Sequence, residues 1–194
     1  MSSSTLQTFR CAACAETYTA VVYTLIDAEA EPELRERVID GSLFIRECPH
    51  CGCRELINSP VIYKEKGHLV CLSGQPVAVE GLGDIVGRRV TDTGSLVEKV
   101  KIFAAGLDDA AVELCKFVTC NELSKDVSLR FVSLDGADNE MIFAYPEDGQ
   151  MQMIATGFNV YENCRAIISR NPAMQESLKG LPCVDGAWVD QFMK

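Results

Sequence analysis

The sequence contains few histidines and no long apolar run. The only two histidines among its 194 residues, His50 and His68, leave the second half without a histidine for acid–base catalysis. The longest stretches without a charged residue are about 13 residues, whereas a membrane-spanning helix needs roughly 18. The first residues lack the basic and apolar regions of a cleaved secretion signal. We therefore expect no membrane association and a cytoplasmic location.

Basic residues are also scarce, since 18 Lys and Arg stand against 28 Asp and Glu and give a net charge of −10. The acidic excess is shared: residues 1–80 carry 7 basic and 11 acidic side chains, and the remaining residues carry 11 and 17. Neither half is a basic module, which argues against nucleic acid or an anionic membrane as the main partner. The other proportions, including 47% hydrophobic residues, are typical of a globular protein.

Cysteine is unusually abundant, with ten residues, and four of them form two C-x-x-C pairs. Cys11 and Cys14 form the first pair, and Cys48 and Cys51 form the second, with 33 residues between Cys14 and Cys48. Two residues between thiolates let a tight turn direct both sulfurs at one ion, and two such turns complete a tetrahedral zinc site. We predict one structural Zn²⁺ per chain, bound by Cys11, Cys14, Cys48 and Cys51. Four thiolates leave no open position for catalysis, and we assign no catalytic residue.

Several neighbouring residues leave alternatives open. Redox chemistry is the main rival for C-x-x-C, but in thioredoxin-like proteins a single pair opens a long helix after a strand, unlike either pair here. His50 and Cys53 lie beside the second pair, and either is a possible replacement ligand; we interpret both as bystanders. His68 is interpreted as a surface or packed residue. The roles of Cys71 and Cys183 stay unassigned.

The residues around the cysteine pairs favour β-structure. Their β-branched, aromatic, Pro and Gly residues predict strands over 17–26 and 43–46 and a short helix over 32–40. Gly52 permits the positive φ angle that a zinc-binding turn needs. The fold class predicted for the chain is α+β, and residues 1–72 are predicted to form a zinc-ribbon-like β domain with a short inserted helix.

Residues 11–51 resemble the CpXC domain, a bacterial and archaeal family named for two Cys-Pro-x-Cys motifs. The resemblance is carried by Cys48-Pro49-His50-Cys51-Gly52 and by residues 32–44 before it, and it continues through 89–90 and 95–100 to Leu107-Asp108-Asp109. The first motif departs from the family pattern, because Ala12 replaces Pro and Ala15 replaces the following Gly. The resemblance supports the four cysteines as one unit and implies no activity.

The second half is predicted to be a separate α+β domain over residues 95–194, after a Gly- and Pro-rich connector over 73–94. We expect helices over 95–104, 109–122 and 160–169, packed on an antiparallel β-meander of strands over 127–134, 140–145 and 151–156. Ser95-x-x-Glu98 predicts a capping box, and Asn159 is expected to cap the last of these helices. Met151 and Met153 are interpreted as core residues. Gly81-x-Gly83 resembles a dinucleotide motif only incompletely.

Three functional hypotheses follow. The leading one is a zinc-binding protein-interaction or scaffold module whose partner is another protein or a second copy. The second is an enzyme that uses carboxylates in a cleft between the halves, the candidates being Asp108, Asp109, Glu113 and Asp185, although a helix cap and a first-turn carboxylate explain Asp108 and Asp109. The third is a zinc-ribbon reader of nucleic acid, which requires a local basic stripe of Arg35, Arg37, Arg46 and Arg54.

Overall fold

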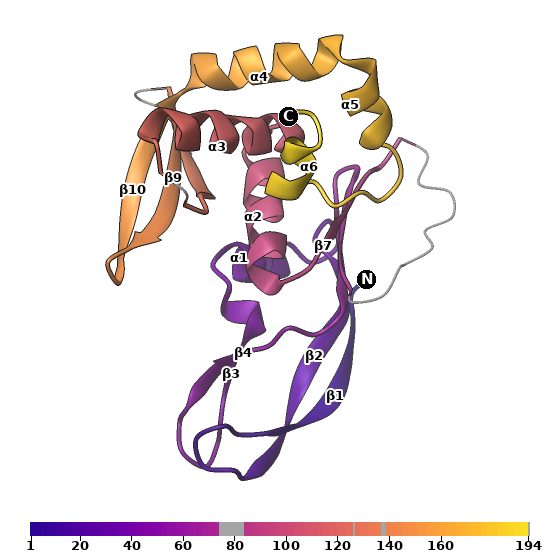
Figure 1. Cartoon of the computed structure of the whole chain (residues 1–194). Coiled ribbons are helices and arrows are strands. Elements are labelled where there is room, and N and C mark those ends of the chain that lie inside the picture. The colour runs from indigo at the N-terminus through magenta and orange to yellow at the C-terminus, as the bar shows by residue number, and fades with distance from the viewer. Residues whose placement is uncertain (74–83, 126, 137–138, 194) are drawn as a thin grey trace. The chain divides into compact units, whose positions relative to one another are not determined.

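The computed structural model describes residues 1–73, 84–125, 127–136 and 139–193 (Figure 1). The chain forms two compact units, Met1–Val97 and Glu98–Lys194, and the boundary falls inside helix α2, Thr93–Ala104. The mixture of strands and helices confirms the predicted α+β class. The division into residues 1–72, 73–94 and 95–194 stays a prediction. Part of the predicted connector, with Gly81 and Gly83, lies outside the described residues.

The first unit contains a five-stranded mixed sheet with the order β1-β2-β5-β6-β7. Its strands are β1 Ser3–Arg10, β2 Thr17–Asp27, β5 Val61–Glu65, β6 His68–Leu72 and β7 Val86–Val90. The β1/β2 and β5/β6 pairs are antiparallel, whereas β2/β5 and β6/β7 are parallel. The predicted strand over 17–26 matches β2, and β1 lies at an edge of the sheet beside it.

The remaining elements of the first unit lead to the connection that carries the second cysteine pair. Helix α1 spans Pro32–Ile39, a 3₁₀ turn η1 spans Ser42–Phe44, and strands β3 Ile45–Glu47 and β4 Arg54–Leu56 form an antiparallel ladder. The predicted helix over 32–40 is confirmed, with Pro at its start. The predicted strand over 43–46 begins later, at Ile45, because Gly41 has φ +78° and leads into the 3₁₀ turn. The β3–β4 connection carries Cys48 and Cys51.

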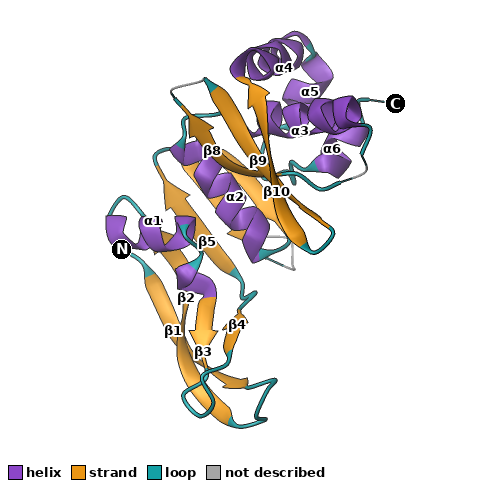
Figure 2. Cartoon of the chain, turned by 90° about the vertical axis from the view of Figure 1, so that its left-hand side faces the viewer, coloured by secondary structure: helices purple, strands orange, loops and turns teal. Residues whose placement is uncertain are grey.

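The second unit contains the predicted antiparallel meander, in the order β10-β9-β8 (Figure 2). The strands are β8 Arg130–Asp135, β9 Glu140–Glu147 and β10 Gln150–Gly157. Buried Phe131 and Phe143 contact each other edge-on within the core of this unit. Met151 and Met153 are 62% and 57% exposed, so their assignment to the core is wrong. They alternate with Ile154, which contacts the core, and therefore lie on the opposite face of β10.

The remaining helices are α3 Asp109–Leu123, α4 Phe158–Arg170, α5 Pro172–Ser177 and α6 Gly186–Asp190. The predicted capping box at Ser95 is wrong: the Asp92 carboxylate accepts the Ser95 N–H at 2.8 Å, and α2 begins two residues earlier than expected. The predicted cap at Asn159 is also wrong, since α4 begins directly after Gly157. Ser and Asn favour helix starts in general, but other residues already occupy the cap positions here.

Candidate metal centre

The first cysteine pair lies in a tight turn between β1 and β2. The Cys11 N–H donates to the Glu16 carbonyl at 2.9 Å, and the Ala15 N–H donates to the Cys11 carbonyl at 2.9 Å. Ala15 has φ +62°, in the left-handed region that L side chains disfavour. An alanine therefore adopts here a backbone conformation that glycine adopts more readily.

The second pair repeats this turn between β3 and β4. The Cys48 N–H donates to the Cys53 carbonyl at 2.8 Å, and the Gly52 N–H donates to the Cys48 carbonyl at 2.9 Å. Gly52 has φ +72°, as its predicted role in the turn requires. The two turns share the same hydrogen-bond pattern and the same left-handed residue. The Ala replacements in the first motif therefore leave the shape of its turn intact.

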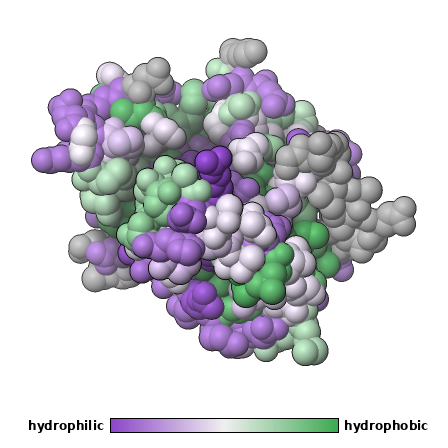
Figure 3. Space-filling view, turned by 90° about the horizontal axis from the view of Figure 1, so that it is seen from below, coloured by the Kyte–Doolittle hydropathy of each residue, from purple (hydrophilic) through white to green (hydrophobic). Residues whose placement is uncertain are grey.

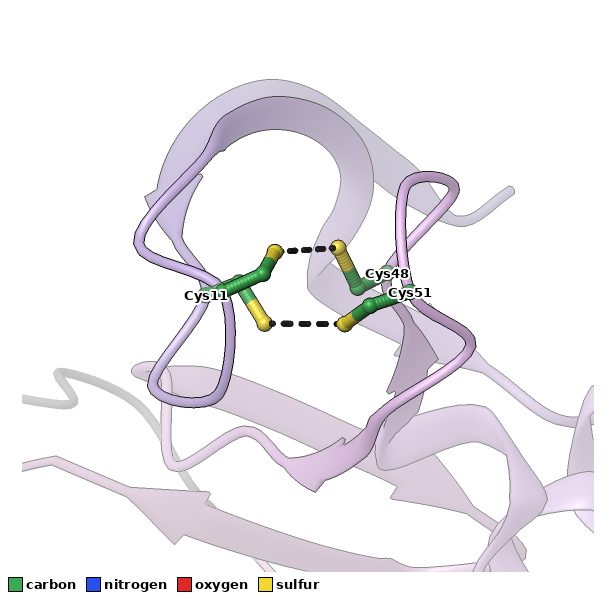
Figure 4. A group of neighbouring side chains, drawn as sticks. Cys11, Cys48 and Cys51 are labelled. Carbon is green, nitrogen blue, oxygen red and sulfur yellow. Dashed lines mark hydrogen bonds between the residues drawn. The ribbon is translucent and has the colours of Figure 1, made fainter.

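The four sulfur atoms converge between the two turns (Figure 4). The Cys11 and Cys51 sulfurs are 3.6 Å apart, and the Cys14 and Cys48 sulfurs are 3.8 Å apart. All four lie within 4.8 Å of one another, and all four thiols are free rather than disulfide-bonded. Sulfurs placed tetrahedrally at 2.3 Å from a zinc ion are about 3.8 Å apart. The observed spacing fits a tetrahedral cation site.

The family comparison covers this centre. The family model for the CpXC protein matches residues 9–80. This match confirms the resemblance predicted from the sequence, and the CpXC segment contains all four cysteines. The expected continuation of the likeness to Asp109 lies beyond the matched residues. Searches of the curated proteins and of the solved structures returned no match.

Burial within the CpXC segment differs among the four thiols. Cys11 and Cys48 are buried against Tyr18, whereas Cys51 is exposed. A backbone hydrogen bond from Cys14 lowers the pKa of the Cys11 thiol to about 7. A backbone hydrogen bond from Glu16 favours the Cys14 thiolate, yet burial and the neighbouring sulfurs raise the pKa of Cys14 to about 12. Simultaneous ionisation of such close thiols requires a compensating positive charge, which a divalent cation supplies.

A second group of donor atoms adjoins the four cysteines. Cys11, Cys53 and Glu55 each offer one ligand atom within 4.8 Å of the other two. Glu55, on β4, also accepts the Ala12 N–H at 2.8 Å and so connects the two turns. In the described residues, neither His50 nor His68 joins a group of potential metal ligands. Sequence reasoning missed Glu55, because its position beside Cys11 depends on how the two turns meet.

The four candidate carboxylates of the second unit have structural partners. Asp108 accepts the Ala111 N–H at 3.0 Å and caps α3 as expected, and Asp185 accepts the Trp188 N–H at 3.0 Å and caps α6. Asp109 and Glu113 are buried instead, and the Lys99 ammonium lies 2.9 Å and 3.1 Å from their oxygens. Asp109 lies in the first turn of α3, as the sequence predicted, but the sequence gave no sign of its pairing with Lys99. Asp108 and Asp185 are thus helix caps, and Asp109 and Glu113 pair with Lys99.

The four candidate arginines for nucleic acid do not form an unengaged basic stripe. Arg35 forms ion pairs with Glu36 and Glu65. Arg46 donates to the backbone carbonyls of Leu43, Ile45 and Val21. Two of the four positive side chains are thus committed to contacts within the first unit. The structure does not test the other predicted partner classes. None of the helices in the described ranges is long and apolar enough to cross a membrane.

Proposed function

We propose that Cys11, Cys14, Cys48 and Cys51 bind one Zn²⁺ as a structural ion. The observation that carries this proposal is the match between the 3.6 Å and 3.8 Å sulfur separations and the edge of a zinc–thiolate tetrahedron. Thiolate ligands in tetrahedral geometry favour zinc among common biological cations, and four of them saturate its coordination. With the four thiolates counted, the zinc-loaded chain has a charge near −12, roughly two units more negative than the sequence charge.

The proposed ion fastens the β1–β2 turn to the β3–β4 turn. Each turn contributes two thiolates, and the small buried cluster around them consists of Cys11, Tyr18 and Cys48. Such a cluster is too small to hold two turns together by apolar burial alone. Structural zinc contributes on the order of 10–16 kcal/mol of apparent binding free energy, which acts as folding free energy when the unfolded chain has no site. We expect this end of the first unit to depend on the metal.

The test is metal analysis of the full chain purified without added zinc. The proposal expects one tightly held zinc per chain and its loss in Cys48→Ser, with a lower unfolding temperature. Cys183→Ser is the matched control, because it removes a thiol that belongs to neither group of potential ligands. Protein that carries no metal, titrates all ten thiols freely and unfolds identically with and without a strong chelator would overturn the proposal.

We further propose that the zinc-bound unit is an interaction module that pairs with a second copy through β1. This strand lies at an edge of the five-stranded sheet and carries no charge from Ser3 to Phe9. Leu6 is 73% exposed and lies directly opposite Val21, which is 47% exposed. An uncharged, exposed edge strand can pair with another strand, and here no like charges oppose self-pairing despite the acidic chain.

A matched substitution tests this second proposal. Hydrophobic residues reach the surface among hydrophilic ones on the face drawn in Figure 3. Sedimentation at rising concentration is expected to show a dimer, and Leu6→Lys is expected to shift it toward monomer by placing like charges at the pairing edge. Met151→Lys is the control, since it adds the same charge to an exposed strand of the other unit. A monomer at all concentrations would refute self-pairing.

A further inference from the structure

We propose that the chain binds a second thiophilic divalent cation through Cys11, Cys53 and Glu55, with the Cys11 thiolate bridging the two ions. This inference rests on the proposed first zinc site, because Cys11 belongs to both ligand sets. The second set supplies two sulfurs and one carboxylate oxygen, leaving a fourth position for water or a small anion. A site with three protein ligands and one open position differs in kind from the saturated first site.

Local geometry brings the second set together without any rearrangement of the backbone. The three ligand atoms lie within 4.8 Å of one another. The Cys53 carbonyl accepts the Cys48 N–H, so the residue that closes the second turn also places its own thiol beside Cys11. The hydrogen bond from the Ala12 N–H fixes the Glu55 carboxylate at the first turn, as outer hydrogen bonds do for carboxylate ligands of metals.

The hydroxyl of Tyr18 gives an independent indication of a ligand at this place. Tyr18 is 7% exposed and belongs to the same buried cluster as Cys11, with Cys53 packed against it. Its hydroxyl is buried and has no hydrogen-bond partner among the described residues. An unsatisfied buried hydroxyl costs about 1–3 kcal/mol, so a native structure normally supplies it with a partner. Water or an anion on the second cation would be such a partner.

Charge balance also favours a second cation. Four thiolates around one divalent ion carry a net charge of −2. Cys53 and Glu55 lie beside this site and belong to the second set of ligand atoms. A second divalent ion would replace the Cys53 proton, which passes to solvent, and offset the added thiolate and carboxylate charges. The cluster of two ions would then keep a net charge of −2.

The test is a cadmium titration of the full, reduced, metal-free chain. Native mass spectrometry counts bound ions, and ultraviolet thiolate-to-cadmium absorption reports the number of sulfurs engaged. We expect two Cd²⁺ per wild-type chain, one in Cys53→Ser and two in Cys183→Ser, the thiol control. Glu55→Gln is expected to weaken the second ion by at least about 10-fold. Glu47→Gln, on the neighbouring strand, is the carboxylate control and should leave both ions unchanged.

The possible counts separate this inference from the proposed function. One ion in wild type that survives in Cys53→Ser would overturn the second site and leave the first intact. No bound ion would overturn both. Two ions in both wild type and Cys53→Ser would place the second ion elsewhere and also overturn the inference. Tyr18→Phe is expected to weaken only the second ion, while stabilising the metal-free chain by removing the unsatisfied hydroxyl; unchanged binding of the second ion would refute the hydroxyl's part.

Discussion

Ala15 and Gly52 occupy equivalent positions in two turns of the same geometry, so exchanging their residue types tests the turn account directly. Ala15 has φ +62° and Gly52 has φ +72°. Replacing Ala15 by Gly should stabilise the first unit, because glycine adopts the left-handed region without a Cβ clash. Replacing Gly52 by Ala should destabilise it for the same reason. A Cβ built on Gly52 has no heavy atom within 4 Å, so this second effect is confined to the backbone.

The magnitude follows from two opposing terms. The left-handed conformation costs an L-residue about 1–2 kcal/mol. Glycine offsets about 0.4–1 kcal/mol of this gain, because its greater conformational freedom stabilises the unfolded chain. Ala15→Gly is therefore expected to raise the free energy of unfolding by about 1 kcal/mol, and Gly52→Ala to lower it by about the same amount.

Denaturant unfolding of the full chain measures both effects. Zinc must be held at the same saturating concentration, because a ligand that binds only the folded state shifts apparent stability. The double variant Ala15→Gly with Gly52→Ala should lie close to wild type. If Ala15→Gly destabilised the chain, or if Gly52→Ala had no effect, the equivalence of the two turns would be refuted.

Three further predictions concern the ion pairs of the second unit and the metal dependence of the first. Lys99→Met leaves the buried Asp109 carboxylate without its ammonium partner and should lower the free energy of unfolding by about 3–5 kcal/mol. Lys179→Met, at an exposed ion pair, should lower it by less than about 0.5 kcal/mol. Equal losses in the two variants would contradict the burial argument. Burial opposes ionisation of Glu98, but Lys116, the Phe131 N–H and Arg130 outweigh burial and lower the pKa of Glu98 below its ordinary 4.5. The Glu98 carboxylate therefore stabilises the fold fully above pH 4.5, and this stabilisation is lost as the pH falls through the lower folded-state pKa. Unfolding free energies from about pH 5 to pH 3 should fall less steeply in Glu98→Gln than in wild type, and identical slopes would refute this assignment. A strong chelator should lower the unfolding temperature of wild type and leave Cys48→Ser unchanged, and an equal response of both proteins would count against a structural ion.

Local patterns predicted much of the fold correctly. The meander was recognisable because short polar turns separate its strands, and α3 because Asp108 precedes a helical apolar stripe. Strand β1 was missed, since its residues are mostly exposed on both faces and β2 is its neighbour on one side alone. The exposed side chains of Met151 and Met153 were missed because alternation alone does not say which face of a strand is covered.

The candidate site, like the fold, was predictable from the sequence only in part. The spacing of Cys11 and Cys14, repeated in the second pair, was sufficient to predict that four thiols converge. The neighbouring donors were not predictable, because Glu55 comes beside Cys11 only when the two turns are brought together. The interactions of Lys99 with Asp109 and Glu113 likewise join two helices, and no local pattern indicates them.

The central claim is that the four cysteines form one zinc–thiolate tetrahedron. The most direct measurement is X-ray absorption at the zinc edge for the full chain loaded with one equivalent of zinc. The account predicts four sulfur neighbours at about 2.3 Å and no nitrogen or oxygen neighbour. A first shell with nitrogen or oxygen ligands, or zinc that does not remain bound to the chain, would contradict it.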